Sequence, residues 1–353
     1  MLDKKNLLSL AKTVAKADSS APIAYSYEGQ DFSYDALNET LRKEFNEYAC
    51  DYRTYQKNKD LIFEVIEEVL NDVLPKRVEL AYGSFAEVKT FKQGDKPLFR
   101  RRINARQRAK QFITRVGLAG VYEVFKLGGS ESFEVPTSAI GGAAQIGFEE
   151  FLDGRVDFAE LVSIVMEGMD DLVYQEVAKA MVDGINQLPT NNKGTTNGFN
   201  EELMDHLIMV ANAYGTPTIY CLEEFAVKML KPTDYNRYSD AMKQEVWDNG
   251  HLASYKGKKV VILPQTFTDE TNSRKLIDPG YCWIIPDGGD NRPVKIAFEG
   301  ETHAREVDQN QDWSREIQIY KKAGVVAMMT NNICVYEDTS LKGKLDVTKP
   351  AGD

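Results

Sequence analysis

DFAELVSIVMEGMDDLVYQEVAKAMVDGIN, residues 157–186, is the stretch that decides the fold. Its apolar residues recur at steps of three and four, which is the period of one face of an α-helix. Asp157 is placed to cap this helix with Glu160 as its capping-box partner, and Pro189 ends it. At a rise of about 1.5 Å per residue the helix is roughly 45 Å long, whereas three or four turns are usual. The pattern predicts either a long amphipathic core helix or a spine along which an extended subunit is built.

The overall composition is that of a soluble, acidic globular chain. Its 353 residues are enough for about two domains, and 42% of them are hydrophobic. The net charge of -11 disfavours tight binding of nucleic acid over a broad face, although a local basic patch is compatible with it. The four cysteines lack C-x-x-C spacing, so we expect free thiols in a reducing compartment. Because no export signal or membrane-spanning run is present, we expect cytosolic synthesis.

The N-terminal part is expected to be helical. The first 30 residues contain a short amphipathic helix and a linker, which we interpret as an arm rather than a core element. A helix capped by Ser33 follows and runs to about Tyr55. A second helix covers residues 61–70 and ends at Pro75. These two helices could pack as a hairpin or join as one bent rod.

A dense basic run follows two extended segments. Residues 85–91 and 97–103 are predicted strands joined by a turn, and a second extended segment covers residues 111–127. The basic residues are Arg100, Arg101, Arg102, Arg106, Arg108, Lys110 and Arg115. The region up to Arg115 is hairpin-like and poor in core residues. Its arginines could form a solvated face, bind phosphate, or belong to a projecting arm that docks on another copy of this acidic chain.

The remaining chain combines short helices with strands. A small, Gly-rich segment precedes the long helix, and a polar loop over residues 190–200 follows it. Helices are predicted at 201–214 and 223–230. Strands are predicted at 216–221, 257–264, 281–285, 294–298, 316–321, 325–329 and 333–336, and the polar tail from 342 is expected to be disordered.

The sequence contains no recognisable catalytic or metal-binding motif. His206, His251 and His303 lack metal-ligand spacing, and no nucleophile elbow occurs. Asp170 and Asp171 are neighbours on a helix, so their carboxylates diverge and are poorly placed as an acid and base pair. We therefore predict no catalytic residue, no metal and no cofactor, and a protein that is not an enzyme.

The order of these parts resembles the major capsid proteins of tailed bacteriophages, which have the HK97-like fold. The resemblance spans residues 85–337 and depends on the arrangement of segments more than on residue identity. The segments concerned are the long acidic helix at 157–186, the strand and helix at 215–230, the loop and strand at 250–262, and a closing strand at 330–338. The implied α+β fold has an N-terminal arm with helices (1–80), an E-loop region (81–130), a peripheral domain (131–189 and 291–340), an axial domain (190–290) and a tail (341–353).

The resemblance implies a major capsid, or head, protein that self-assembles into the icosahedral shell enclosing double-stranded DNA. Its implied partners are other copies in hexamers and pentamers, a portal, scaffolding or decoration proteins, and weakly contacted DNA, with no membrane. Its implied location is the virion capsid, after synthesis and assembly in the host cytoplasm. The alternatives are an encapsulin-like compartment shell, or a cytosolic nucleic-acid-binding protein or enzyme that uses the basic run at 100–115.

The basic run also yields a specific hypothesis about assembly. We expect it to meet carboxylates of an adjacent subunit, because 54 acidic residues against 43 basic ones provide many targets in a symmetric assembly. A guanidinium group suits this role because it pairs with a carboxylate through two parallel hydrogen bonds. We also expect a shell interior that is acidic or neutral, so that DNA can slide past it. The contact candidates are Arg100, Arg101, Arg102, Arg106, Arg108, Glu167, Asp170 and Asp171.

Overall fold

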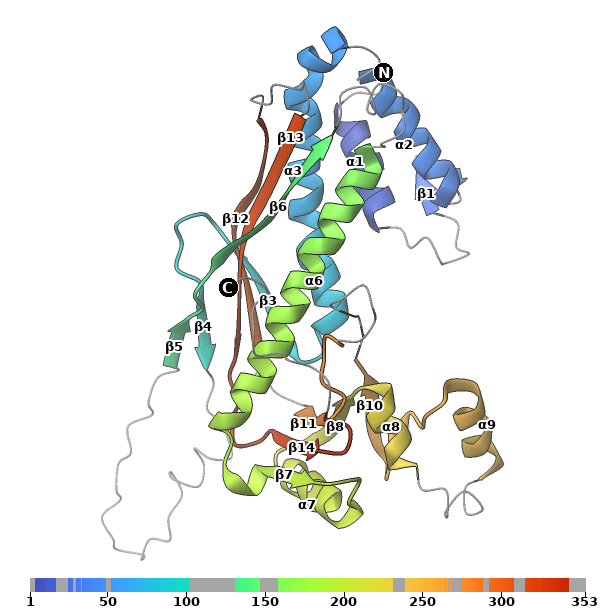
Figure 1. Ribbon diagram of the computed structural model, residues 1–353, viewed down its shortest axis with the longest axis vertical. Helices are drawn as coiled ribbons and strands as arrows, with labels where there is room; N and C mark the ends of the chain where they lie inside the picture. The colour runs from blue at the N-terminus through green and yellow to red at the C-terminus, as the bar shows by residue number, and fades with distance from the viewer. Residues whose placement is uncertain are drawn as a thin grey trace, which may run out of the picture.

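The protein is an elongated α+β molecule, as a computed structural model shows (Figure 1). The structure describes residues 4–16, 25–27, 30–32, 34–48, 52–101, 131–146, 158–230, 239–263, 265, 267, 275–287, 292–307 and 315–342. Long helices and a four-stranded sheet run along the long axis, and a six-stranded sheet lies at one end. The α+β class predicted from the sequence is confirmed.

The N-terminal helix is part of the core and not an arm, which corrects our expectation. Helix α1 (Lys4–Lys16) packs against α2 (Tyr34–Tyr48) and α3 (Tyr52–Tyr82), and the short strands β1 (Tyr25–Tyr27) and β2 (Gln30–Phe32) pair between α1 and α2. Leu7 and Leu10 are fully buried, and Lys4 forms an ion pair with Glu64 of α3 at 2.5 Å. The leucines are spaced for one helix face, and α3 offers the apolar stripe that covers them.

Helix α3 continues through Pro75, where we expected it to end. A proline inside a helix removes a hydrogen bond and crowds the preceding turn, at a cost of about 3 kcal/mol. Val73, Leu74, Val78 and Tyr82, on both sides of the proline, are nearly fully buried. Their burial offsets this cost, because each large apolar side chain contributes about 1.5–3 kcal/mol when it leaves water.

The four-stranded sheet has the order β3-β12-β13-β6. Its strands are β3 (Ala86–Phe91), β12 (Val294–Val307), β13 (Arg315–Ala327) and β6 (Ser138–Ile146). Strand β3 pairs in parallel with β12, whereas the other pairs are antiparallel. We expected β3 to form a hairpin with the next strand, and this was wrong. That strand, β4 (Leu98–Arg101), pairs instead with β5 (Glu131–Glu134).

Side chains of α3 complete the backbone hydrogen bonds of an irregular point in β12. The register between β12 and β13 shifts between Glu299 and His303. Near the shift, Asn71 Oδ1 accepts hydrogen bonds from the Thr302 backbone N–H and the Thr302 hydroxyl, both at 2.8 Å. Glu67 Oε1 accepts from the Ala304 N–H at 2.7 Å. Because an unpaired buried N–H is costly, these contacts fix α3 on this sheet.

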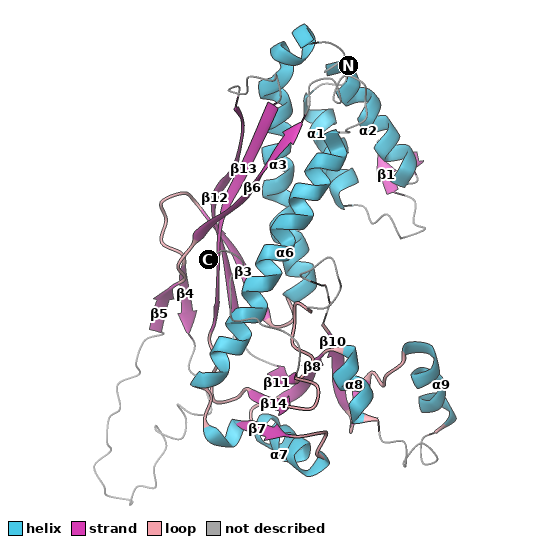
Figure 2. Cartoon of the chain, in the orientation of Figure 1, coloured by secondary structure: helices cyan, strands magenta, loops and turns pink. Residues whose placement is uncertain are grey.

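The long helix predicted from residues 157–186 is observed as α6 (Phe158–Gly184), followed by a short 3₁₀ turn at Ile185–Gln187. It runs obliquely along the four-stranded sheet (Figure 2) and also packs against α3. Met169, Val173, Val177 and Met181, at steps of four, are buried. The helix therefore joins the sheet and the N-terminal helices into one body.

The second sheet has the order β7-β14-β11-β8-β10-β9. Its strands are β7 (Lys193–Thr196), β14 (Cys334–Asp338), β11 (Tyr281–Asp287), β8 (Thr216–Cys221), β10 (Lys258–Ile262) and β9 (Ser254–Tyr255). Strand β7 lies in the predicted polar loop. Strand β14 pairs with β7 and β11 and not with the four-stranded sheet, so residues 334–338 fall outside the unit to which we assigned residues 291–340. Its buried Tyr336 hydroxyl accepts the Asn200 N–H at 2.6 Å, which holds it there.

Both faces of the six-stranded sheet are covered. Alternating residues of its central strands point to opposite sides, as the two-residue period of a strand requires. On one side Tyr220 and Trp283 join the core that contains α3 and α6, and the Tyr220 and Phe85 rings lie 5.2 Å apart. On the other side Cys221 and Ile284 pack with α7 (Glu201–Asn212) and α8 (Glu223–Met229).

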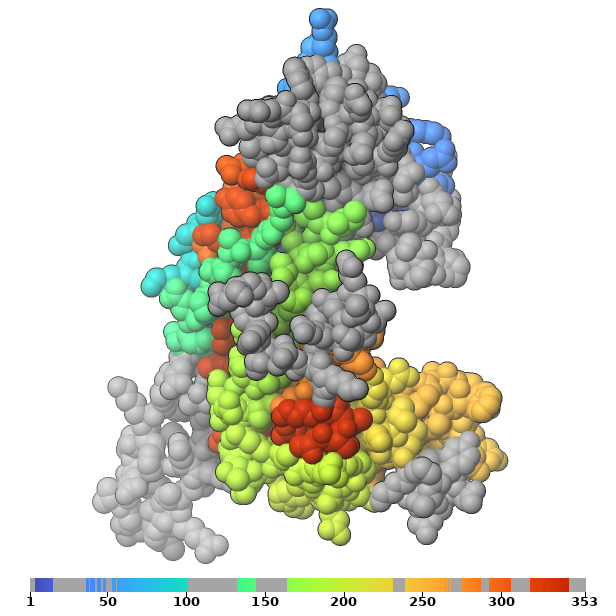
Figure 3. Space-filling view, viewed as in Figure 1, coloured from blue at the N-terminus to red at the C-terminus, as the bar shows by residue number. Residues whose placement is uncertain are grey.

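The helix α9 (Asp240–Asn249) was not predicted from the sequence. Its ends have ordinary signals, because the Ser239 hydroxyl accepts the Met242 N–H and Gly250 has the left-handed conformation with a φ of 77°. The helix lies at the outer edge of the end that holds the six-stranded sheet (Figures 1 and 3). None of its residues is buried.

Candidate assembly surfaces

The two-stranded ribbon of β4 and β5 has a buried aromatic face and an exposed face, which carries Leu98 and Arg100 from β4 and Ser132 and Glu134 from β5. Phe99 is fully buried and stacks with Phe133, the residue opposite it, with ring centres 6.2 Å apart. The alternation of side chains along β4 therefore turns Leu98 and Arg100 outward. Leu98 is 47% exposed and Arg100 is exposed. The ribbon is thus anchored by an aromatic core while its outer face remains open to another molecule.

The structure places only part of the predicted basic run. Arg100 is exposed on β4, and Arg101 ends that strand opposite Glu131. Arg102, Arg106 and Arg108 lie outside the described residues. The exposed position of Arg100 agrees with a role in contacting another molecule, whereas the contact itself stays a prediction.

The acidic residues of α6 divide between two faces of the helix. Glu167 and Asp171, four residues apart, are both exposed. Ile164 and Leu172 are exposed on neighbouring positions, at 60% and 40%. Exposed aliphatic side chains beside carboxylates form a surface on which both a basic and an apolar partner could dock.

Asp170 faces the other way and is not available to another subunit, which corrects its place among the contact candidates. It is 2% exposed, and its Oδ2 lies 2.9 Å from the guanidinium Nε of Arg77 on α3. The alignment is not that of a hydrogen bond, so neither carboxylate oxygen accepts one from a described residue. Burial raises the pKa of Asp170 to about 7, although the Arg77 guanidinium opposes this. Asp170 is therefore a group of the interface between α3 and α6.

The exposure of several apolar side chains was not predicted from the sequence. Ile164, Leu172 and Trp247 lie on helices whose other residues gave no indication that these would face outward. Trp247 of α9 is 83% exposed. A signal for α9 was available in Ser239 and Gly250, which mark a helix start and end, but nothing in the pattern indicates that Trp247 is exposed.

Within the described residues, no group of acidic, histidine or cysteine side chains is arranged to hold a metal ion. The helices of the described part include none that is both long and apolar enough to span a membrane. Cys221, Cys282 and Cys334 are free and buried.

Comparison with protein families identifies the chain. The model of the family described as "SPbeta prophage-derived putative capsid protein YonB" matches residues 6–337. The chain belongs to this family. It is a phage capsid protein, as the resemblance of its parts to HK97-like capsid proteins predicted from the sequence. A capsid protein is a structural subunit of a shell, and self-assembly is its central property.

Solved structures of capsids and related shells resemble the chain more distantly. The virus-like particle from Pyrococcus furiosus is 17% identical, with 78% of this chain and 99% of that chain covered and a TM-score of 0.41. The head of Helicobacter pylori bacteriophage KHP40 is 11% identical, with coverage of 74% and 91% and a TM-score of 0.46. The satellite phage P4 procapsid, which includes the size determination (Sid) protein, is 9% identical, with coverage of 77% and 90% and a TM-score of 0.46. No curated protein matches the chain.

Proposed function

We propose that this chain is the major head protein of a tailed phage, and that its copies form the icosahedral shell around double-stranded DNA. Membership of a capsid family over residues 6–337 supports this proposal most directly. The shell forms in the host cytoplasm and becomes part of the virion. The subunit has no catalytic role in this function.

The elements of the subunit correspond to the domains of a shell protein. The four-stranded sheet with α3 and α6 forms the peripheral domain, and the six-stranded sheet with α7, α8 and α9 forms the axial domain. The β4–β5 ribbon is the base of the E-loop. Its outward Leu98 and Arg100 meet a neighbouring copy at the α6 surface around Glu167 and Asp171. Each exposed ion pair contributes only about 0–1 kcal/mol, but a shell repeats every contact many times.

Other partners follow from the same function. The subunit contacts a portal, and scaffolding or decoration proteins where the phage encodes them. Its contact with packaged DNA is weak and non-specific. A net charge of -11 supports an interior that is acidic or neutral, because many phosphate contacts would oppose packaging.

Charge reversal on β4 tests the E-loop contact. Arg100→Glu should leave the subunit folded and soluble but reduce assembly into large particles, as measured by size-exclusion chromatography and electron microscopy. Lys92→Glu, an equal charge change at an exposed position in the turn before β4, is the matched control and should assemble normally. Adding Glu167→Arg and Asp171→Arg to Arg100→Glu should restore part of the assembly.

Three other outcomes would contradict parts of this proposal. Equal assembly of the Arg100 and Lys92 variants at moderate salt contradicts the E-loop contact. Particles that enclose a protein and no nucleic acid would identify a compartment shell of the encapsulin kind. A wild-type chain that remains a small oligomer under all assembly conditions would reject the shell function.

A further inference from the structure

Strand β6 is an open edge of the four-stranded sheet. Its nine residues pair with β13 on one side, and no strand of the described chain pairs with the other side. The outward N–H and C=O groups of β6 therefore have no hydrogen-bond partner among the described residues. Ser138, Ala139 and residues 141–143 are exposed, and the strand lies at the surface beside α6 (Figure 3). The edge is thus accessible to another chain.

Strand β6 also lacks the features that normally protect an edge strand. Soluble proteins protect such edges with charged side chains, proline, a bulge or a very short strand. Residues 138–146 read SAIGGAAQI, with no charge and no proline, and their register with β13 has no shift. The opposite edge of the same sheet, β3, has the expected protection in Glu87 and Lys89. An unprotected edge of this length is a template for pairing with another strand.

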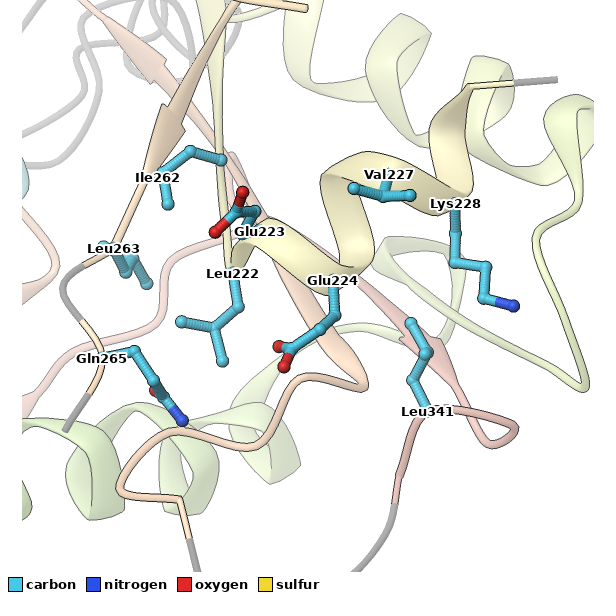
Figure 4. A pocket seen from close by; sticks show the side chains of 9 residues that line it. All are labelled: Leu222, Glu223, Glu224, Val227, Lys228, Ile262, Leu263, Gln265 and Leu341. Atoms are coloured by element: carbon cyan, nitrogen blue, oxygen red, sulfur yellow. The ribbon is translucent and has the colours of Figure 1, made fainter. Parts of the chain in front are cut away.

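Other open surfaces of the described chain differ from β6 in this respect. The edge strands of the six-stranded sheet, β7 and β9, have only four and two residues. A hollow beside α8 has a volume of about 600 Å³, and Glu223, Glu224 and Lys228 line it together with leucines (Figure 4). Charged side chains make such a surface compatible with water, so it does not require a partner. The backbone groups of β6, in contrast, are best satisfied by a partner strand.

A second copy of β6 is the strand that fits this edge. The partner must be extended and must itself have a free edge, and β6 is the longest uncharged strand with a free edge in the described chain. Pairing of β6 with its own copy about a two-fold axis is antiparallel, which is the more stable arrangement per residue. Two-fold contacts are also the commonest in assemblies of identical chains. The basic run at 100–115 would find no carboxylate on β6, so charge does not favour it as the partner.

The sequence of β6 permits a symmetric register centred on Gly142. In this register Gly142 faces its own copy, and residues 138–141 face residues 146–143 of the partner, so that the whole strand is paired. Each opposed pair contains at least one glycine, alanine or serine, and no pair opposes two charges. A Cβ at Gly142 would meet nothing within 4 Å, so the centre of the register leaves room for the second chain.

We propose that β6 pairs with β6 of an adjacent copy across a two-fold axis. The two four-stranded sheets then form one continuous sheet, in the order β3-β12-β13-β6-β6-β13-β12-β3. Backbone hydrogen bonds provide the main attraction, so the contact tolerates most side-chain changes but not like charges at its centre. The inference rests on the proposed shell function and names a contact between the peripheral domains of two copies.

A charge at the centre of the register tests this pairing. Gly142→Lys places two like charges directly opposite each other, so it should lower the assembled fraction at a fixed subunit concentration by about fivefold or more. Gly142→Asp should do the same. A mixture of the two variants should recover assembly, because lysine then faces aspartate. Circular dichroism of the unassembled variants should show a folded subunit, since a side chain at this position has room.

The matched control adds the same charge to the other edge of the sheet. Thr90 is exposed on β3, so Thr90→Lys should assemble like the wild type. Equal assembly of the Gly142→Lys and Thr90→Lys variants overturns the proposal. It is also overturned if the mixture of lysine and aspartate variants assembles no better than either variant alone.

A single cysteine tests which strands meet. In Gly142→Cys the two cysteines of a pair would face each other, and the Cα separation of about 4.5–5.5 Å in antiparallel pairs lies within the range that a disulfide spans. Assembled protein oxidised with a small-molecule disulfide should give a covalent dimer on a non-reducing denaturing gel and no larger species. Thr90→Cys and the wild-type chain are controls and should remain monomeric on this gel. Normal particles without the dimer, or covalent species larger than a dimer, contradict the two-fold contact.

Failure of the shell function gives a different pattern. If the wild-type chain forms no particles, but Gly142→Cys gives the covalent dimer in solution, the strand pairing is supported and the shell is rejected. If particles containing DNA form and the dimer is absent, the shell is supported and the strand pairing is rejected.

Discussion

The buried carboxylate of Asp170 should make the subunit less stable as the pH rises. Burial raises its pKa from the ordinary value of 3.8 to about 7 in the folded protein. Between these two values the folded state binds more protons than the unfolded state, so the free energy of unfolding falls with increasing pH. Burial of Asp170 therefore does not lower the free energy of unfolding below pH 3.8, and it lowers this free energy by the full amount above about pH 7.

The size of the effect follows from the pKa difference. The shift corresponds to about 3 pKa units, and each unit is worth about 1.36 kcal/mol, which gives a ceiling of about 4 kcal/mol. Asp170→Asn removes the charge and keeps the shape, so it should raise the free energy of unfolding by up to this amount at about pH 8. The gain should vanish near pH 4, where the native carboxyl is itself protonated in the folded state.

Substitution of Arg77, the partner of Asp170, should lower the free energy of unfolding. Arg77→Met removes the cation that lowers the Asp170 pKa, so this pKa rises further and the buried carboxyl takes up a proton. At about pH 8, one unit above the folded pKa of about 7, the free energy of unfolding should therefore fall by at most about 1.4 kcal/mol. The Arg77 side chain is 39% exposed and partly screened by solvent, so we expect a loss below this ceiling. In the double variant, Asp170→Asn should recover most of the loss, since the group that needed the cation is gone.

Urea unfolding of the unassembled subunit, followed by circular dichroism at several pH values, measures these differences. The wild type, the two single variants and the double variant form one cycle. The reasoning is refuted if Asp170→Asn is no more stable than the wild type at about pH 8, or if its gain is the same at pH 4.

Three further substitutions test other contacts. Lys321 is buried, and burial lowers its pKa from 10.5 to about 8. Lys321→Met should therefore raise the thermal midpoint at neutral pH by the equivalent of up to about 3 kcal/mol. This gain should shrink as the pH rises toward 10.5. A Cβ at Gly141 would lie 2.8 Å from the Tyr320 Cα, whereas one at Gly142 would meet nothing within 4 Å. In chemical unfolding, Gly141→Ala should therefore lower the free energy of unfolding by about 1–3 kcal/mol, and Gly142→Ala should change it little. Tyr336→Phe leaves the Asn200 N–H without its acceptor and should lower the denaturant midpoint by the equivalent of about 1–3 kcal/mol without altering the slope.

The elements with a strong local period could be predicted from the sequence. The apolar steps at 158–185 predicted α6, and the β-branched run after residue 257 predicted β10, because their periods alone determine the element. The helix through Pro75 could not be predicted in this way, because the cost of the proline is local and the burial that offsets it is tertiary.

Strand pairing and the surfaces depended on distant parts of the chain. The turn at residues 92–96 indicated a hairpin, but β3 has its partner in β12, about 200 residues later. Asp170 and Asp171 are neighbours in sequence, yet one is buried and the other exposed, since only the first faces α3. Leu7 and Leu10 of α1 are likewise buried against an apolar stripe of α3, and a local sequence pattern cannot show that these two helices pack together.

The core that continues from α3 and α6 into one face of the six-stranded sheet has a mechanical consequence. Phe85, Tyr220 and Trp283 belong to one packed cluster, so the two sheets share side chains and do not meet across a polar seam. Packed interiors have low compressibility and resist gradual deformation. The described part of the subunit should therefore transmit force like a rigid lever. When a shell made of such subunits changes its curvature, the bending must occur where copies touch each other and not between the two sheets of one copy.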